Sequence, residues 1–269
     1  DIDNVSIRFV GTDNSEQRNY QMERSDALLL ATLNNETKKI KMVSIPRDSY
    51  VYIPQFEYYD KANAAYAYGG VDATVGMVED LLDVPVDYYV SINFDAFVDV
   101  VNALGGITVE VPYEFTESNS RDKRDSIHLY PGEQELNGEE ALALARTRKM
   151  DNDFERNKRQ QEIIKALFNK TISIGSIPQY DNLIDAVGDN MKTNVTFDKM
   201  KTFISYAASK QLSFETIELT GSSDRVNNIW YHIIDEDSLA KTQQKLKENL
   251  NINHNTETSA SSAEDRTRG

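Results

Sequence analysis

The chain has 269 residues, of which 39% are apolar and 27% are charged, a mixture typical of globular proteins. Its 44 acidic residues outnumber its 29 basic ones, and the resulting net charge of −15 argues against a nucleic-acid partner, because phosphate backbones need a broad basic face. The absence of cysteine excludes disulfides and thiolate metal sites, and three histidines without ligand spacing disfavour a zinc site.

Apolar runs and helical periodicity predict strands that alternate with helices along the chain. Strands are predicted at 5–10, 27–33, 40–45, 88–92, 107–111 and 214–219. Helices are predicted at 61–68, 71–82, 94–104, 153–170, 180–191, 197–210 and 237–250, and one more begins after an N-cap at Asn137. Residues 114–126 are expected to form a surface loop. The alternation favours an α/β fold in one domain, 1–252, followed by a disordered polar tail, 253–269.

A basic cluster stands out from this acidic background. Residues 146–160 (RTRKMDNDFERNKRQ) contain six Lys or Arg and three acidic residues. Local positive charge in an acidic protein indicates an anion site, and the planar guanidinium group of arginine suits phosphate best. We therefore interpret this segment as half of a phosphate site.

The predicted helix 153–170 should direct part of this cluster inward. Ile163 and Leu167 belong to its apolar stripe, and steps of three or four residues back along that stripe reach Gln160 and Arg156. Both polar side chains should therefore point inward at the N-terminal end of the helix, where the helix dipole also favours an anion.

Arg146 and Arg148 precede this helix. If the segment is extended, the two side chains share one face and could grip phosphate together with Arg156. An alternative of about equal weight is that these arginines form ordinary surface ion pairs, which contribute little stability. Their partners would then be Asp151, Asp153 and Glu155.

Further charged residues border the predicted strands. Arg24 and Asp26 begin one strand, Arg47 follows another, and Asp13 follows the first. Ligand sites of α/β sheets lie beyond strand ends, and two carboxylates there could hold Mg2+ together with phosphate oxygens. The alternative is that Asp13 and Asp26 each cap a turn. Lys61 could reach a phosphate or face solvent.

Six motifs occur in an order that resembles the LytR-CpsA-Psr family, collinear from about Val5 to Phe168. They are RSDALLL (24–30), SIPRD (44–48), KANAAYAYGG (61–70), FVDVVNALGGITVEVP (97–112), LNGEEALALARTR (136–148) and DNDFERNKRQ (151–160). The resemblance implies an α-β-α layered fold with a central mixed sheet, flanking helices and a lipid-binding groove.

The resemblance also implies a function. Family members are envelope enzymes of Gram-positive bacteria, held at the extracytoplasmic face by a single N-terminal membrane anchor, which would lie outside this chain. Their donor is an undecaprenyl-pyrophosphate-linked glycopolymer, such as wall teichoic acid or a capsule-like polymer. They transfer it with its phosphate to peptidoglycan, typically to the C6 hydroxyl of N-acetylmuramic acid, and some cleave polyprenyl pyrophosphate.

Residue roles follow from the same motifs. The resemblance assigns Mg2+ to Asp13 and Asp26. It assigns catalytic roles to Arg47, Arg148, Asp153 and Arg156, and substrate-binding roles to Arg24, Lys61, Arg146 and Gln160. For the base that takes the proton of the acceptor hydroxyl, Asp153 is the first choice and Asp48 the alternative.

There are two alternatives to a transferase function, a non-catalytic lipid-binding module and a nucleotide phosphohydrolase. The same pocket could bind polyprenyl phosphate without reacting, as a lipid-carrier or regulatory module of the envelope. A nucleotide phosphohydrolase would need a glycine-rich phosphate loop, and the chain has no GxxxxGK[ST] pattern.

Overall fold

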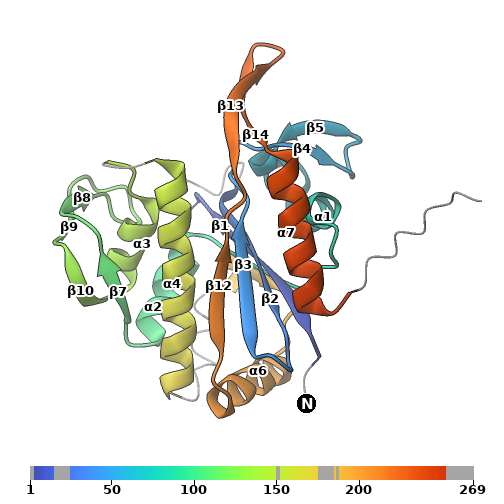
Figure 1. Ribbon diagram of the computed structural model, residues 1–269. Coiled ribbons are helices and arrows are strands. Elements are labelled where there is room, and N and C mark those ends of the chain that lie inside the picture. The colour runs from blue at the N-terminus through green and yellow to red at the C-terminus, as the bar shows by residue number, and fades with distance from the viewer. Residues whose placement is uncertain (1–2, 15–24, 150–151, 175–184, 186–187, 253–269) are drawn as a thin grey trace, which may run out of the picture.

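A computed structural model describes residues 3–14, 25–149, 152–174, 185 and 188–252 of the chain (Figure 1). The predicted tail 253–269 and Arg24 lie outside these residues. The strands are β1 (Val5–Thr12), β2 (Ser25–Leu33), β3 (Lys39–Ser44), β4 (Tyr50–Ile53), β5 (Tyr58–Lys61), β6 (Tyr88–Ile92), β7 (Ile107–Val111), β8 (Phe115–Glu117), β9 (Ile127–Leu129), β10 (Gly132–Leu136), β11 (Met191–Thr193), β12 (Ser213–Ile217), β13 (Gly221–Val226) and β14 (Ile229–Ile234). The helices are α1 (Ala62–Leu82), α2 (Phe94–Ala103), α3 (Gly138–Arg146), α4 (Asp153–Ile174), α6 (Phe197–Ser209) and α7 (Glu236–Leu250), with a 3-10 turn at Gly188–Asn190.

The main sheet has six strands in the order β11-β6-β1-β2-β3-β12. Strands β1, β2 and β3 pair antiparallel, whereas β6 and β12 add in parallel on the two sides and β11 closes one edge antiparallel. The predicted α-β-α fold with a central mixed sheet is therefore confirmed. The long apolar strands β2 and β3 lie inside the sheet, where both of their faces are covered.

One face of this sheet packs against α1 and α7. Because strand side chains alternate, Val10, Leu28 and Leu30 point to this face and enter a continuous core with Met77 of α1 and Leu246 of α7. Leu30, Met77 and Leu246 are completely buried. This face is a packed core that holds the strands in place.

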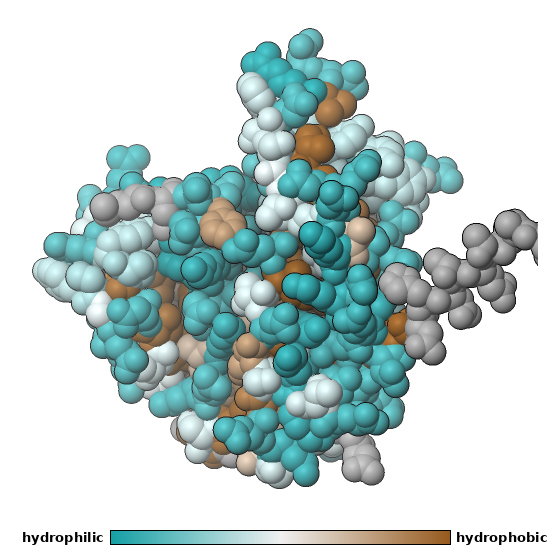
Figure 2. All heavy atoms as spheres, in the orientation of Figure 1, coloured by the Kyte–Doolittle hydropathy of each residue, from teal (hydrophilic) through white to brown (hydrophobic). Residues whose placement is uncertain are grey.

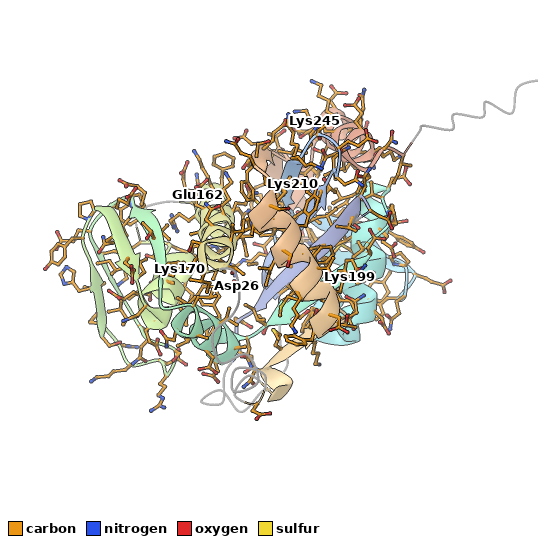
Figure 3. All side chains as sticks on the ribbon, turned by 90° about the horizontal axis from the view of Figure 1, so that it is seen from below. Asp26, Glu162, Lys170, Lys199, Lys210 and Lys245 are labelled. Atoms are coloured by element: carbon orange, nitrogen blue, oxygen red, sulfur yellow. The ribbon has the colours of Figure 1, made fainter. Side chains whose placement is uncertain are left out.

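The opposite face is covered by α2, α4 and α6 but is not filled. The helices α3 and α4 pack mainly on the small sheet β7–β10, around a second core that includes Leu136 and Ile163. Seen from below, α6 crosses beneath the strands (Figure 3). Phe9 and Leu29 alternate along their strands with the residues of the packed face, so their side chains point the other way. They face a cavity between the sheet and these helices.

Most predicted elements are confirmed, and the differences have local causes. The helices predicted at 61–68 and 71–82 are one element, α1, interrupted at Gly70, whose φ of 63° no ordinary helical residue adopts. The loop predicted at 114–126 contains β8. Three short strand pairs were not predicted from the sequence: β4–β5, β8–β9 and β13–β14.

The helix predicted at 180–191 is wrong at its C-terminal end. Most of that range lies outside the described residues, but Gly188–Asn190 is a 3-10 turn and Met191 begins β11. β11 pairs with β6 over three residues, so edge pairing with the sheet overrides the helical pattern at this point.

Candidate functional site

Three arginines from distant parts of the chain converge on Asp26 at one end of the main sheet. Asp26 Oδ1 lies 2.9 Å from Nη1 of Arg47, 3.4 Å from Nη2 of Arg148 and 3.9 Å from Nη1 of Arg156. The predicted convergence of Arg47, Arg148 and Arg156 is therefore present in the structure. We call Asp26 and these three arginines the arginine cluster.

Strand pairing explains why Asp26 and Arg47 meet. In the antiparallel pair β2–β3, Leu29 lies opposite Ser44, so the residues before Leu29 and after Ser44 share one end of the sheet. The loop after β3 is then held by backbone hydrogen bonds, which include Asn63 N to Arg47 O at 3.0 Å and Ser49 N to Pro46 O at 3.0 Å. Arg47 is thus fixed on a short, anchored loop.

The connection between α3 and α4 places the other two arginines. Asn137 begins α3 with a capping box, in which its side chain and that of Glu140 exchange hydrogen bonds with each other's backbone. Arg159 of α4 is buried and donates to the carbonyls of Leu144 and Thr147. It fastens the end of α3 to α4 and so positions Arg148.

Arg156 is the most buried member of the cluster, with 1% of its surface exposed. Its Nη2 lies 3.0 Å from Oδ1 of Asp153, but Nε and Nη1 have no hydrogen-bond partner. Burial lowers the pKa of Arg156, against the opposing effect of the nearby Asp26 and Asp153 carboxylates. A buried guanidinium with unused donors has the chemistry to bind an anion, since those donors lack partners within the protein.

A second ionic group adjoins the cluster. Asp48 Oδ1 lies 3.5 Å from Nζ of Lys61, and Asp48 Oδ2 lies 4.0 Å from Nε of Arg47. The lysine also lies 5.9 Å from the ring centroid of Tyr231. Four cationic side chains therefore adjoin three carboxylates: Arg47, Lys61, Arg148 and Arg156 against Asp26, Asp48 and Asp153.

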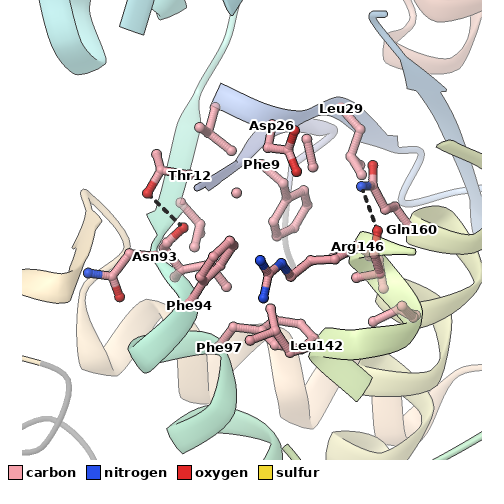
Figure 4. A pocket seen from close by; sticks show the side chains of 18 residues that line it. Phe9, Thr12, Asp26, Leu29, Asn93, Phe94, Phe97, Leu142, Arg146 and Gln160 are labelled. Atoms are coloured by element: carbon pink, nitrogen blue, oxygen red, sulfur yellow. Dashed lines mark hydrogen bonds between the residues drawn. The ribbon is translucent and has the colours of Figure 1, made fainter. Parts of the chain in front are cut away.

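The condition under which Arg146 and Arg148 would share one face, an extended segment, is not met. Arg146 is the last residue of α3, and a helix end turns consecutive side chains to different sides. Its guanidinium lies 4.3 Å from the ring centroid of Phe94 and 3.7 Å from a carboxylate oxygen of Asp122. Figure 4 shows Arg146 among Phe9, Phe94 and Phe97, inside an apolar pocket that Asp26 also lines.

Gln160 lines the same pocket, as its place on the inward stripe of α4 predicts. Its Nε2 donates to the carbonyl of Ala145 at 3.2 Å, so the side chain also ties α4 to α3 (Figure 4).

The alternative of surface ion pairs is partly correct, because Asp153 does contact Arg148 and Arg156. It is wrong about the setting, since Arg156 is buried and also contacts Asp26 across the fold.

Asp13 and Asp26 occupy the same end of neighbouring strands. Thr12 at the end of β1 pairs with Ser25 at the start of β2, with a register shift after Gly11. Within the described parts of the chain, no group of three or more His, Cys, Asp or Glu is arranged to hold a metal. Two carboxylates suit Mg2+, which commonly takes one or two protein carboxylates and completes its shell with substrate phosphate and water.

An apolar channel leads away from the arginine cluster along the open face of the sheet. The pocket beside Asp26, with a volume of about 100 Å³, continues into a larger cavity of about 400 Å³ under α6. Phe9, Val90 and Ile164 line both, so the two hollows adjoin, and we call them together the channel. An apolar cavity of this size inside a small domain is unusual, because protein interiors are close-packed.

A second hollow, the polar groove, opens on the other side of α4 with a volume of about 740 Å³. It is bordered by the N-terminal half of α4, β12 and the hairpin β13–β14, on the face shown in Figure 2. Asp48, Asp153, Trp230 and His232 line it. Trp230 and His232 were not predicted as site residues, but the Asn227-Asn228 pair is a hairpin signal, and both residues have positive φ.

His232 makes stability depend on pH. Its Nε2 is buried without a hydrogen-bond partner, and burial lowers its pKa below the usual 6.5 despite Asp235, Asp48 and Asp153. The unfolded chain therefore binds this proton more readily, and stability is lost as the pH falls from about 6.5 towards the folded-state pKa. In urea titrations at pH 7.5 and 5.5, His232→Gln should lose less stability than the wild type.

The difference should stay within the roughly 1.4 kcal/mol per pH unit that one proton allows. His128→Gln is the matched control, because His128 is exposed and pairs with Glu114. An unchanged pH dependence in His232→Gln would contradict this assignment.

The sequence of this chain is similar to those of known proteins. The family model described as the LytR_cpsA_psr family matches residues 1–248. An uncharacterized Staphylococcus aureus protein is 42% identical over 253 residues, which are 92% of this chain and 62% of that protein's length. The polyisoprenyl-teichoic acid–peptidoglycan teichoic acid transferase TagT of Bacillus subtilis is 40% identical over 253 residues, 93% of this chain and 78% of that protein.

Solved structures of known proteins are similar to the fold of this chain. A structure of TagT bound to LI-WTA superposes with a TM-score of 0.77 at 37% identity, covering 93% of this chain and 91% of that one. The LytR-CPS2A-psr family protein YwtF (TagT) with bound octaprenyl pyrophosphate lipid gives a TM-score of 0.72 at 34% identity, with the same coverage. In the described residues no helix is long and apolar enough to span a bilayer. The family-model match over residues 1–248, the similar sequences and the similar structures show that the chain belongs to the LytR_cpsA_psr family.

Proposed function

We propose that this protein is a phosphotransferase that moves a glycopolymer from a polyprenyl-pyrophosphate carrier to a hydroxyl group of peptidoglycan. One observation carries the proposal: the arginine cluster lies at the mouth of the apolar channel. Asp26 belongs to both, because it lines the channel and contacts Arg47 and Arg148. A ligand with a diphosphate head and a long apolar tail fits this combination.

The channel suits a prenyl chain by its lining and its place. Its inner part is walled by apolar side chains of the sheet, α4 and α6, such as Ile7, Phe168 and Phe203. Burying a prenyl chain there is favourable by about 25 cal/mol for each square ångström of apolar surface. The octaprenyl pyrophosphate bound to the similar TagT structure supports this assignment.

The arginines would act on the charge of the diphosphate. The acceptor oxygen forms a bond to the phosphorus that carries the polymer, and the bond from that phosphorus to the bridging oxygen breaks. The lipid phosphate leaves with the electron pair of that bond. Arg47, Arg148 and Arg156 stabilise the negative charge that moves onto it, which is the main form of catalysis in phosphoryl transfer.

A carboxylate takes the proton of the attacking hydroxyl. Asp153 and Asp48 both line the polar groove, next to the arginine cluster. Asp153 contacts Arg148 and Arg156, whereas Asp48 contacts Lys61 and Arg47. Asp153 remains the first candidate for the base, because it contacts two arginines of the cluster directly, and Asp48 remains the alternative.

Asp13 and Asp26 are the residues that would hold Mg2+. When bound, the ion supplies further positive charge to the diphosphate and helps to orient it. The residues of this chain then bind the lipid, align the diphosphate and accept the proton. Arg146 and Gln160, which line the channel mouth, are proposed substrate contacts. Arg24, which lies outside the described residues, is proposed as a substrate contact from the family resemblance alone.

The finer assignments rest on the family. The acceptor is proposed to be the C6 hydroxyl of N-acetylmuramic acid, and the polymer wall teichoic acid or a capsule-like polymer. The protein would act at the extracytoplasmic face of the membrane, held by an N-terminal anchor. The name of the 40% identical Bacillus subtilis transferase supports a teichoic acid donor.

Turnover with both substrates tests this function. The purified protein is incubated with a lipid-pyrophosphate-linked polymer and isolated peptidoglycan, and polymer attached to peptidoglycan is measured. Attachment that depends on the protein is expected. Tight donor binding without any transfer would instead support the non-catalytic lipid-carrier module.

Narrowing the channel should select against long lipids. Ile164→Trp places a larger ring where the two parts of the channel adjoin. Turnover of a long polyprenyl donor should fall about tenfold or more, which corresponds to a loss of about 1.4 kcal/mol in transition-state stabilisation. A donor with a short prenyl chain should retain most of its activity. Asn169→Trp, exposed on the same helix, is the control. Equal losses for both lipids would contradict the channel assignment.

A further inference from the structure

The polar groove is separated from the lipid channel by α4. Helical spacing sends Gln160, Ile163 and Ile164 to the channel, whereas Asn157 and Gln161 turn to the groove. The two hollows therefore lie on two sides of one helix. The arginine cluster lies at the N-terminal end of that helix, between them.

Contacts within the cluster connect the two sides. Arg148 and Arg156 each reach Asp26, which lines the channel, and Asp153, which lines the groove. A diphosphate held by these arginines therefore has the channel on one side and the groove on the other.

Phosphoryl transfer imposes a direction on this arrangement. The attacking and leaving oxygens lie roughly in line on opposite sides of the phosphorus. If the leaving lipid phosphate points into the channel, the acceptor hydroxyl must approach from the groove. Both candidate bases, Asp153 and Asp48, line the groove, where such a hydroxyl would arrive.

Aromatic side chains at the groove suit a sugar ring. Phe154 is 48% exposed and Trp230 is 55% exposed, so both leave a ring face uncovered. Trp230 is steadied from one side by Arg225, whose guanidinium carbon lies 4.7 Å from the ring centroid. Asn157 and Ser223 add hydrogen-bonding groups to the same walls. Apolar rings with a few polar groups are typical of small-molecule and saccharide sites.

The charge of the groove selects between the two saccharides of the reaction. Its walls carry four carboxylates and one lysine: Asp48, Asp153, Glu162, Glu218 and Lys158. Like charges across an interface cost binding energy, so these walls repel a polymer of repeating phosphates. A glycan strand of N-acetylated sugars has no backbone phosphates and meets far less repulsion.

From these observations, and resting on the proposed transferase function, we infer that the polar groove binds the acceptor, a strand of N-acetylated sugars without backbone phosphates. Phe154 and Trp230 stack on sugar rings, and the hydroxyl to be modified is presented to Asp153 or Asp48. In this arrangement the lipid donor and the acceptor enter from opposite sides of α4 and meet at the arginine cluster.

Fluorescence provides a direct binding test, because Trp230 is the only tryptophan of the chain. Titration of the full protein with an uncharged oligosaccharide of β-1,4-linked N-acetylglucosamine, which has the sugar backbone of the acceptor, should give a saturable change in Trp230 emission. A free teichoic acid polymer without lipid should give no such change. The reverse result would place the donor polymer in the groove and overturn the inference, as would no response to either probe.

Steady-state kinetics test the same groove during transfer. Trp230→Ala should raise KM for the acceptor about tenfold or more and leave KM for the lipid donor within about twofold, while Trp230→Phe should restore most of the acceptor affinity. Tyr130→Ala, which removes a 59% exposed ring elsewhere, is the matched control. A rise in donor KM instead would contradict the inference, and so would unchanged kinetics.

The two measurements separate this inference from the function on which it rests. Glycan binding seen by Trp230 fluorescence without any transfer would leave the groove assignment standing and reject the transferase. Transfer with no glycan response and an unaltered acceptor KM in Trp230→Ala would keep the transferase and reject the groove.

Discussion

Arg148→Ala is expected to lower the rate of glycopolymer transfer about 10³-fold, the range seen when a positioned arginine or oxyanion donor is removed from a phosphoryl-transfer or acyl-transfer site. Arg148 contacts both Asp26 and Asp153, so it bridges the channel side and the groove side of the cluster. Its loss removes charge from the position where the leaving phosphate becomes more negative. Turnover of a lipid-pyrophosphate donor with peptidoglycan measures the effect.

The fold should tolerate this change. Arg148 is 42% exposed, and partly exposed ion pairs contribute little to stability, so thermal unfolding should shift only slightly. Arg121→Ala, at an exposed position elsewhere, is the control and should keep normal turnover. Near-normal activity in Arg148→Ala would reject the catalytic assignment of the cluster.

Arg156 would be a poorer first test. It is 1% exposed and lies between the carboxylates of Asp26 and Asp153. Removing one partner of a buried ion pair commonly costs about 3–5 kcal/mol, so a loss of activity in Arg156→Ala would mix misfolding with chemistry. Arg148 separates the effect on folding from the effect on chemistry, because it contacts the same carboxylates, Asp26 and Asp153, closer to the surface.

Asp26→Asn is expected to reduce transfer by a similar factor, about 10³-fold, because one carboxylate serves two purposes there. It aligns Arg47 and Arg148, at 2.9 and 3.4 Å, and it is one of two proposed Mg2+ ligands. The amide keeps the shape but loses the negative charge that both partners require. Transfer assays and calorimetric titration with Mg2+ together measure the change.

The calorimetry distinguishes the two roles of Asp26. Loss of Mg2+ binding in Asp26→Asn and in Asp13→Asn supports the metal site. Unchanged Mg2+ binding with lost transfer would leave Asp26 as a residue that positions the arginines and would reject it as a ligand. Asp72→Asn, at an exposed position of α1, should alter neither measurement.

The arginine cluster also shows how a protein of net charge −15 could bind the proposed anionic donor. Positive charge is concentrated at one end of the sheet, where low exposure of Arg156 limits screening by water and salt. The acidic remainder of the surface keeps anions from binding elsewhere. Binding of an anion would therefore depend on the few arginines gathered there, and broad surface charge would contribute little.

Several parts of the fold were predictable because local sequence alone specifies them. The apolar runs of β2 and β3 have strand length and are bounded by turn residues, which favours strands buried inside a sheet over buried helix segments. Asn137 and Glu140 cap α3 through bonds within four residues, and Thr196 caps α6 in the same way. The inward stripe of α4 correctly placed Arg156 and Gln160, because helical periodicity needs no tertiary information.

The short hairpins were not predictable in the same way. β4 and β5 are four residues each, and their tyrosines give no clear alternation of apolar and polar positions. β13 is mostly polar and exposed, so its pairing with β14 depends on the Asn227-Asn228 turn and on a partner strand. Short strands of this kind form only when neighbouring elements supply the other half.

By itself, the sequence determined the layered α/β fold, the family and the set of charged residues that could meet a diphosphate. Only the tertiary structure decided that Arg146 enters the channel and Arg148 the cluster, and that Arg159 fastens α3 to α4. It alone revealed the channel and the polar groove on two sides of α4. The reason is physical: periodicity assigns a side chain to a face of its own element, whereas a cavity exists only where faces of several elements fail to fill the space between them.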